Sequence, residues 1–185
     1  NNDRGVYKTV NGGKTWERVL YISDTVGFSD IELLPSNPNI VFATAWKAER
    51  KPWTIISGGD QDEGGLYKSV DGGISWGKIT EGMPSGLIGK IDLAIPKSHS
   101  NIVYALVEAP DDEGGLYKSI DQGKTFDLIS SAEVIRTRPF YYGNVDVHPH
   151  NPDVVFVMAT RNMKSVDGGM TWQRLRPPHG DNHDM

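Results

Sequence analysis

Cysteine, long hydrophobic runs and an excess of basic residues are all missing from this chain. Without cysteine, the 185-residue sequence can form neither disulfide bonds nor thiolate metal sites, and its compartment is left open. No apolar run approaches membrane-spanning length, and the N-terminus has no signal-peptide pattern. The formal net charge of −5 argues against nucleic acid and anionic membranes, because both require a basic surface. We therefore expect no nucleic-acid partner and no membrane insertion.

Glycine and proline are plentiful, with 21 and 11 residues, which suits many short strands joined by tight turns. One short motif occurs four times: a hydroxyl residue, then Asp or Asn, then Gly, then an aromatic residue. Successive copies are separated by roughly 45–60 residues, about the size of one four-stranded propeller blade. The copies are Thr9, Asn11, Gly13 and Trp16; Ser69, Asp71, Gly73 and Trp76; Ser119, Asp121, Gly123 and Phe126; and Ser165, Asp167, Gly169 and Trp172.

Each copy predicts a β-hairpin. The Asp carboxylate can accept backbone N–H bonds across the turn, glycine can adopt positive φ, and the aromatic ring can cover the hairpin. Asn11 and Phe126 replace Asp and Trp in one copy each, and both retain the hydrogen-bonding or packing role. We interpret the repeated acids as turn-stabilising acceptors rather than catalytic groups or metal ligands, since a catalytic group has no reason to recur in every blade.

A second element lies between the hairpins: a strand, a turn with Pro or Asn, and another apolar strand, at 30–43, 90–105 and 144–157. With the hairpin it gives four strands per unit. The sequence therefore predicts an all-β protein, a β-propeller fragment of about three and a half four-stranded antiparallel blades. Because closed propellers have four to eight blades and the chain begins at Asn1, we expect the remaining blades of a longer parent as partners. The expected units are a half blade at about 5–22 and blades at about 28–80, 88–130 and 142–176.

The hairpin motif is that of the Asp-box, or bacterial neuraminidase repeat, found in sialidases, xyloglucan-cleaving tandem propellers and sortilin-like propellers. With the segments 46–53, 138–142 and 179–184, the whole chain resembles the large bacterial sortilin-like repeat proteins that are often labelled glycosyl hydrolases. The resemblance implies an exported parent, secreted or periplasmic. It implies architecture more than mechanism, because these families share the hairpin and not the chemistry.

Candidate ligand-binding residues lie in two stretches that do not repeat. The loop at 46–64 carries tryptophans suited to stacking on sugar rings, or alternatively to capping the neighbouring blade. The stretch at 136–142 joins arginines to aromatic residues, which suits a carboxylate or sugar ligand; an aromatic cluster that packs blades together is the alternative. The candidates are Trp46, Arg50, Trp53, Arg138, Tyr141 and Tyr142.

Metal-binding and catalytic candidates lie elsewhere. His179, Asp181 and His183 alternate near the C-terminus, so an extended strand would place them on one face and let them hold a metal ion; a polar loop is the alternative. We expect no other cofactor. Acids also mark the first strand of each fuller blade. Two of them could hydrolyse a glycosidic bond if their carboxyl groups lay roughly 5–10 Å apart. These catalytic candidates are Asp30, Asp92 and Asp146.

Two functions of different classes follow. The first is a propeller that binds a protein, a peptide or a glycan without catalysis, because everything that repeats is scaffold. The alternative is a glycoside hydrolase that acts on a polysaccharide through paired carboxylates. The sequence favours the binding function.

Overall fold

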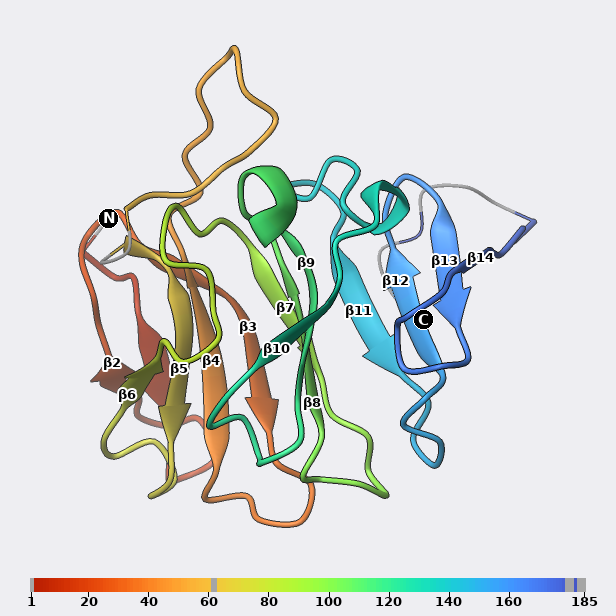
Figure 1. The fold of residues 1–185 in the computed structure, drawn as a ribbon. Coiled ribbons are helices and arrows are strands. Elements are labelled where there is room, and N and C mark those ends of the chain that lie inside the picture. Colours follow the sequence, from red (N-terminus) through yellow and green to blue (C-terminus); the bar gives the residue numbers. More distant parts are fainter. Residues whose placement is uncertain (1, 61–62, 179–181, 183–185) are drawn as a thin grey trace.

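The computed structural model describes residues 2–60, 63–178 and 182, and it forms antiparallel sheets set side by side around an inner edge (Figure 1). A half blade consists of β1 (Val6–Lys8) and β2 (Glu17–Leu20). Blade I contains β3 (Gly27–Leu33), β4 (Val41–Trp46), β5 (Gly65–Ser69) and β6 (Gly77–Ile79). Blade II contains β7 (Ile91–Ala94), β8 (Val103–Val107), β9 (Gly115–Ser119) and β10 (Asp127–Ser130). Blade III contains β11 (Asn144–Val147), β12 (Val155–Met158), β13 (Asn162–Ser165) and β14 (Gln173–Arg174).

The strands of every blade are paired in chain order, so each blade is a meander and the fold is the predicted partial β-propeller. Two 3-10 turns, η2 (Asp111–Glu113) and η3 (Glu133–Ile135), lie in the connections at one end of the blades. We call this end, at the top of Figure 1, the loop end, and the opposite end the turn end. None of the helices in the described part of the chain is long and apolar enough to cross a membrane.

The repeated hairpins owe their shape to the hydrogen bonds of one carboxylate. In the second copy, Asp71 Oδ1 accepts the backbone N–H of Ile74 and of Ser75 at 3.0 and 2.9 Å. Its Oδ2 accepts the Ser75 hydroxyl at 2.5 Å, and the Ser69 hydroxyl donates to Oδ1 at 2.7 Å. These bonds, with that of the Ser75 hydroxyl first, hold the pKa of Asp71 well below its usual range. Gly73, at φ 85°, supplies the left-handed conformation that closes the turn.

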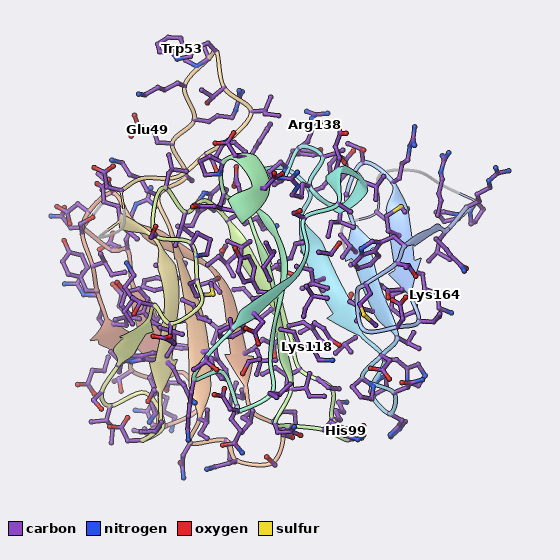
Figure 2. All side chains as sticks on the ribbon, viewed as in Figure 1. Glu49, Trp53, His99, Lys118, Arg138 and Lys164 are labelled. Atoms are coloured by element: carbon purple, nitrogen blue, oxygen red, sulfur yellow. The ribbon has the colours of Figure 1, made fainter. Side chains whose placement is uncertain are left out.

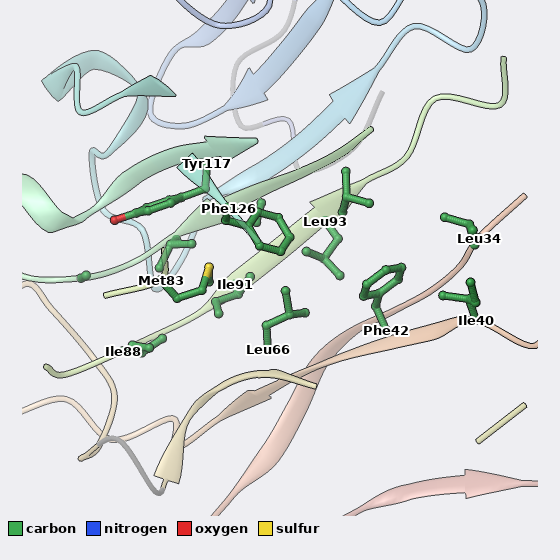
Figure 3. Packing of buried hydrophobic residues seen from close by; sticks show 14 residues of the cluster. Leu34, Ile40, Phe42, Leu66, Met83, Ile88, Ile91, Leu93, Tyr117 and Phe126 are labelled. Atoms are coloured by element: carbon green, nitrogen blue, oxygen red, sulfur yellow. The ribbon is translucent and has the colours of Figure 1, made fainter. Parts of the chain in front are cut away.

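Two hydrophobic clusters fill the spaces between blades. The first lies between blades I and II and includes Phe42, Leu66, Ile91 and Phe126 (Figure 3). The second lies between blades II and III, with Tyr104 at its centre. Because each cluster draws side chains from two blades, the core of this protein is a set of interfaces rather than the interior of single sheets.

The aromatic rings of the hairpins are buried to different extents. Trp16 is 60% exposed, whereas Phe126 at the same motif position is 2% exposed. Two later rings contact the preceding blade: Phe126 belongs to the cluster between blades I and II, and Trp172 Nε1 donates to Ser130 Oγ at 3.2 Å. The half blade has no preceding blade in this chain, so the Trp16 ring has no such surface to pack on.

Lysines join successive blades at the turn end. Lys8 Nζ donates to the carbonyl oxygen of Gly72 at 2.7 Å, and Lys68 Nζ donates to that of Gln122 at 2.6 Å. In each full blade, the lysine just before the hairpin motif pairs with an aromatic residue on the neighbouring strand. The stem of that lysine therefore packs on the neighbouring strand. The ammonium-to-ring distances are 5.5 Å for Lys68 and Phe42, 5.3 Å for Lys118 and Tyr104, and 5.6 Å for Lys164 and Phe156.

Candidate functional site

The connection between β4 and β5 is the longest loop-end connection of the three full blades. It spans residues 47–64, whereas the equivalent connections in blades II and III span 108–114 and 159–161. We call the described residues of this connection, 47–60 and 63–64, the arm. Figure 2 shows it rising above the blades, with Trp53 at its tip and Glu49 nearer its base. Long connections on a rigid scaffold are where propellers place their binding residues.

Hydrogen bonds within the arm give it a defined shape. Lys47 Nζ contacts both carboxylate oxygens of Glu63 at 2.9 Å, which joins the two legs of the arm. These bonds from Lys47 also lower the pKa of Glu63. The Gly58 N–H donates to the carbonyl of Glu49 at 3.0 Å, and higher up Arg50 Nη1 donates to the carbonyl of Thr54 at 2.6 Å.

Two hollows lie along the loop end, one on each side of the arm's base. The first, of about 420 Å³, is lined by Lys47, Thr54 and Ile56 of the arm and by Leu87. The second, of about 430 Å³, is lined by the arm on one side and by the connections of blade II on the other. Ile56 lines both hollows, so they are adjacent, and we call the two hollows together the loop-end groove.

The structure brings the two predicted ligand-binding stretches together beside this groove. The Arg50 guanidinium of the arm lies over the Phe140 ring at 4.6 Å. In the 138–142 stretch, the Arg138 guanidinium lies 5.3 Å from the Tyr141 ring centre, and Tyr141 and Tyr142 meet edge to face at 4.9 Å. Arg138 lies at the loop end, as the arm does (Figure 2).

The tryptophan within the arm and the one just before it have different surroundings. Trp53 is 80% exposed at the tip, where its ring can meet a ligand. Trp46 is half-buried at the end of β4, and its Nε1 donates to Ser57 Oγ at 2.9 Å. A ligand contact suits the exposed Trp53, whereas Trp46 hydrogen-bonds to the base of the arm of its own blade.

The inner-strand acids form a second candidate site. Asp30, Asp92 and Asp146 lie on the adjacent strands β3, β7 and β11, and together with Glu32 they line a hollow of about 250 Å³. Asp30 Oδ2 accepts the Leu93 backbone N–H at 2.9 Å, and Asp92 Oδ2 accepts the Val145 N–H at 2.8 Å. Two of the three predicted catalytic aspartates therefore also join their blade to the next one.

Burial changes the protonation of this carboxylate hollow. Burial, followed by repulsion from Asp30, Asp92 and Asp146, raises the pKa of Glu32 to about 7. Burial likewise raises the pKa of Asp92 to about 7, against the opposing hydrogen bond from the Val145 N–H. The pKa of Asp30 is raised as well, again mainly by burial. Near neutral pH the hollow can therefore contain both protonated and ionised carboxyl groups, which is what acid–base chemistry requires.

The predicted metal ligands His179, Asp181 and His183 lie outside the described residues. Among the residues that are described, no three histidine or acidic side chains gather in an arrangement that could hold a metal ion.

Sequence reasoning missed Glu108, which follows β8 and is 3% exposed. It hydrogen-bonds to Ser57 at the base of the arm, across the boundary between blades I and II. The only signal in the sequence is an acidic residue that continues the apolar run of β8. That pattern does not reveal its partner.

Comparisons with known proteins agree with the propeller architecture, although no protein-family model matches the chain. The chain is 24% identical over 190 residues to the xyloglucanase Xgh74A of Acetivibrio thermocellus, an alignment that covers 92% of this chain. A solved GH74 enzyme from Niastella koreensis has a TM-score of 0.65 at 19% identity, covering 94% of this chain and 27% of that one. YCF48 bound to a D1 peptide has a TM-score of 0.57 at 14% identity, covering 84% and 45%. The chain spans only 22% of the length of the curated xyloglucanase. By its fold, the chain is a partial β-propeller similar to those of GH74 enzymes and YCF48.

Proposed function

We propose that this chain forms part of a propeller that binds an extended polysaccharide of the xyloglucan type in the groove at its loop end. The observation that carries the proposal is that two adjacent hollows lie between the arm of blade I and the connections of blade II, and that the same arm carries the exposed Trp53 at its tip (Figure 2). An open groove that crosses two blades suits a linear chain better than a small compact molecule.

The chemistry of the groove favours a sugar ligand. Trp53 offers a flat apolar face of the kind that sugar rings stack on, and Thr54 and Glu49 supply polar groups close by. The mixed charges of Lys47, Lys51 and Asp60 around the first hollow give it no single sign that would select a charged polymer. Similarity to xyloglucanases supports a glucan with side branches as the ligand.

At the level of family, we propose that the repeated hairpins are Asp-boxes and that the chain derives from a sortilin-like repeat protein. The carboxylate hydrogen bonds of Asp71, Asp121 and Asp167 within their turns support this assignment. We further propose that the partners of the described blades are further blades of a longer propeller.

Removing Trp53 should weaken polysaccharide binding by about tenfold or more, since aromatic anchors dominate many interfaces. The measurement is affinity electrophoresis or calorimetry with soluble xyloglucan, comparing the wild type with Trp53→Ala. Trp16→Ala is the matched control, because Trp16 is also exposed but lies in the first hairpin, away from the groove. Equal loss in the two variants, or no xyloglucan binding by the wild type, would refute the proposal. Binding of peptides instead would favour a peptide-binding propeller.

The carboxylate hollow supports a second candidate function, hydrolysis of a polysaccharide. Glu32 and Asp92, each with a pKa near 7, could divide the roles of general acid and general base. If so, this chain, or a longer protein that contains it, should release reducing sugar from xyloglucan. Glu32→Gln and Asp92→Asn should each reduce that rate at least about a hundredfold. Asp127→Asn, on an outer strand, is the control. Unchanged rates in both hollow variants would exclude the hollow as the catalytic centre.

A further inference from the structure

A buried carboxylate from blade II holds the base of the arm of blade I. Glu108 is 3% exposed and Ser57, within the arm, is 2% exposed. Glu108 Oε1 accepts the Ser57 backbone N–H at 2.6 Å, and Oε2 accepts the Ser57 hydroxyl at 2.7 Å. A carboxylate removed from water requires such partners, because an unpaired buried charge is very costly. The arm is thus attached to the neighbouring blade at a specific point.

The contact extends on both sides of Ser57 and Glu108. Trp46 Nε1 donates to the Ser57 hydroxyl oxygen at 2.9 Å, so the hydroxyl accepts from blade I and donates to Glu108. Glu108 Oε2 also accepts the Lys90 backbone N–H at 2.8 Å. Trp46, Ser57 and Glu108 therefore form a chain of hydrogen bonds that crosses the boundary between the blades beneath the groove.

Glu108 lines the second hollow, yet its three hydrogen bonds all go to the protein itself. It is consequently suited to positioning the arm rather than to contacting a ligand. Farther out, the Arg50 guanidinium of the arm lies over the Phe140 ring, in the connection between blades II and III.

We propose that Glu108 is the positioning residue of the loop-end groove, and that it holds the arm of the neighbouring blade in the orientation in which Trp53 and Ile56 bind the ligand. The effect on ligand affinity rests on the proposed polysaccharide-binding function. The effect of Glu108 on the order of the arm does not depend on that function.

Glu108→Gln tests this role with a nearly isosteric side chain. The carboxylate accepts two backbone N–H groups through different oxygens, that of Ser57 at Oε1 and that of Lys90 at Oε2. Glutamine has one oxygen and one NH₂ group, so in either orientation its NH₂ must face a backbone N–H. One donor then faces another in a buried site, and the arm should detach to relieve that contact.

The experiment measures hydrogen exchange of residues 47–60 and xyloglucan affinity on the same samples. We expect Glu108→Gln to speed exchange of the arm by about tenfold or more and to weaken affinity severalfold. Asp121→Asn is the matched control, since it perturbs a hairpin turn of blade II without touching the arm. It should lower the melting temperature but leave exchange of the arm unchanged. If Glu108→Gln does not fold, Ser57→Ala, which removes only the hydroxyl, takes its place.

Unchanged exchange in the arm of Glu108→Gln would overturn the proposal. Faster exchange with unchanged affinity would also overturn it, because the position of the arm would then not matter for binding. If the wild type binds no xyloglucan, the polysaccharide proposal fails on its own, and the exchange result still decides whether Glu108 positions the arm.

Discussion

Replacing Phe42 with alanine is expected to reduce the free energy of unfolding by about 3–5 kcal/mol. The Phe42 side chain is fully buried in the cluster between blades I and II, and its ring fills the space above Gly123 of the next blade. Removing it leaves a cavity at the interface between the two blades and takes away the ring beneath the Lys68 ammonium. The melting temperature should fall by roughly 10 °C, which calorimetry or denaturant titration would measure.

Phe156→Ala is the matched control for Phe42→Ala. Phe156 has the same position in the register of blade III, opposite Lys164, as Phe42 has in blade I opposite Lys68. It is only half-buried. Because Phe156→Ala returns less apolar surface to water, we expect it to reduce the free energy of unfolding by about 1–2 kcal/mol. Equal losses for Phe42 and Phe156 would contradict the view that stability resides in the contacts between blades.

Thermal stability should be greatest in mildly acidic solution, near pH 5. The pKa values of Glu32 and Asp92 are raised to about 7 in the folded chain, so between about pH 4 and pH 7 the folded state binds more protons than the unfolded state. Stability therefore falls as the pH rises through this window and levels off above it. A series of melting temperatures from pH 3 to pH 9 would measure the effect.

The hairpin carboxylates produce the opposite trend at low pH. Hydrogen bonds from the Thr171 hydroxyl and backbone N–H, together with that of Ser165, lower the pKa of Asp167 to about 2. Their stabilising effect is complete above the pKa of an unfolded aspartate, about 4, and is lost as the pH falls towards 2. The double variant Glu32→Gln/Asp92→Asn should reduce the fall in melting temperature between pH 5 and pH 8. It should leave the fall in melting temperature at low pH unchanged. A wild-type melting temperature that does not change from pH 5 to pH 8 would contradict the raised pKa values.

The hairpins could be predicted from the sequence because their stabilising contacts are local. Asp71 bonds to residues no more than four positions away, so the sequence from Ser69 to Ser75 contains the whole turn. The arm is different. Trp46, just before it, and Trp53, within it, are equivalent in the sequence. They differ because the Ser57 hydroxyl binds Trp46 and is itself bound by Glu108, 51 residues away.

The inner-strand acids are an intermediate case. The alternation of the strands places Asp30, Asp92 and Asp146 on one face, and the structure brings them to one hollow. What the pattern could not supply was the pairing of their oxygens with the main chain of the next blade, because that depends on the distance and twist between two sheets. The same limit applies to Glu32, whose pKa is raised mainly by burial and further by repulsion from three carboxylates of three blades.

The polar bonds between blades also bear on how such a chain could grow during evolution. Lys8 and Lys68 bind carbonyl oxygens, and Asp30 and Asp92 bind N–H groups, so all four recognise the neighbour's main chain and none of its side chains. Every blade offers these same main-chain groups, whatever its sequence. A duplicated or exchanged blade would therefore find these main-chain attachments already in place, whereas the apolar contacts and side-chain pairs such as Trp172 and Ser130 would have to adapt. The blade can in this way act as a transferable unit, while loops such as the arm diverge independently.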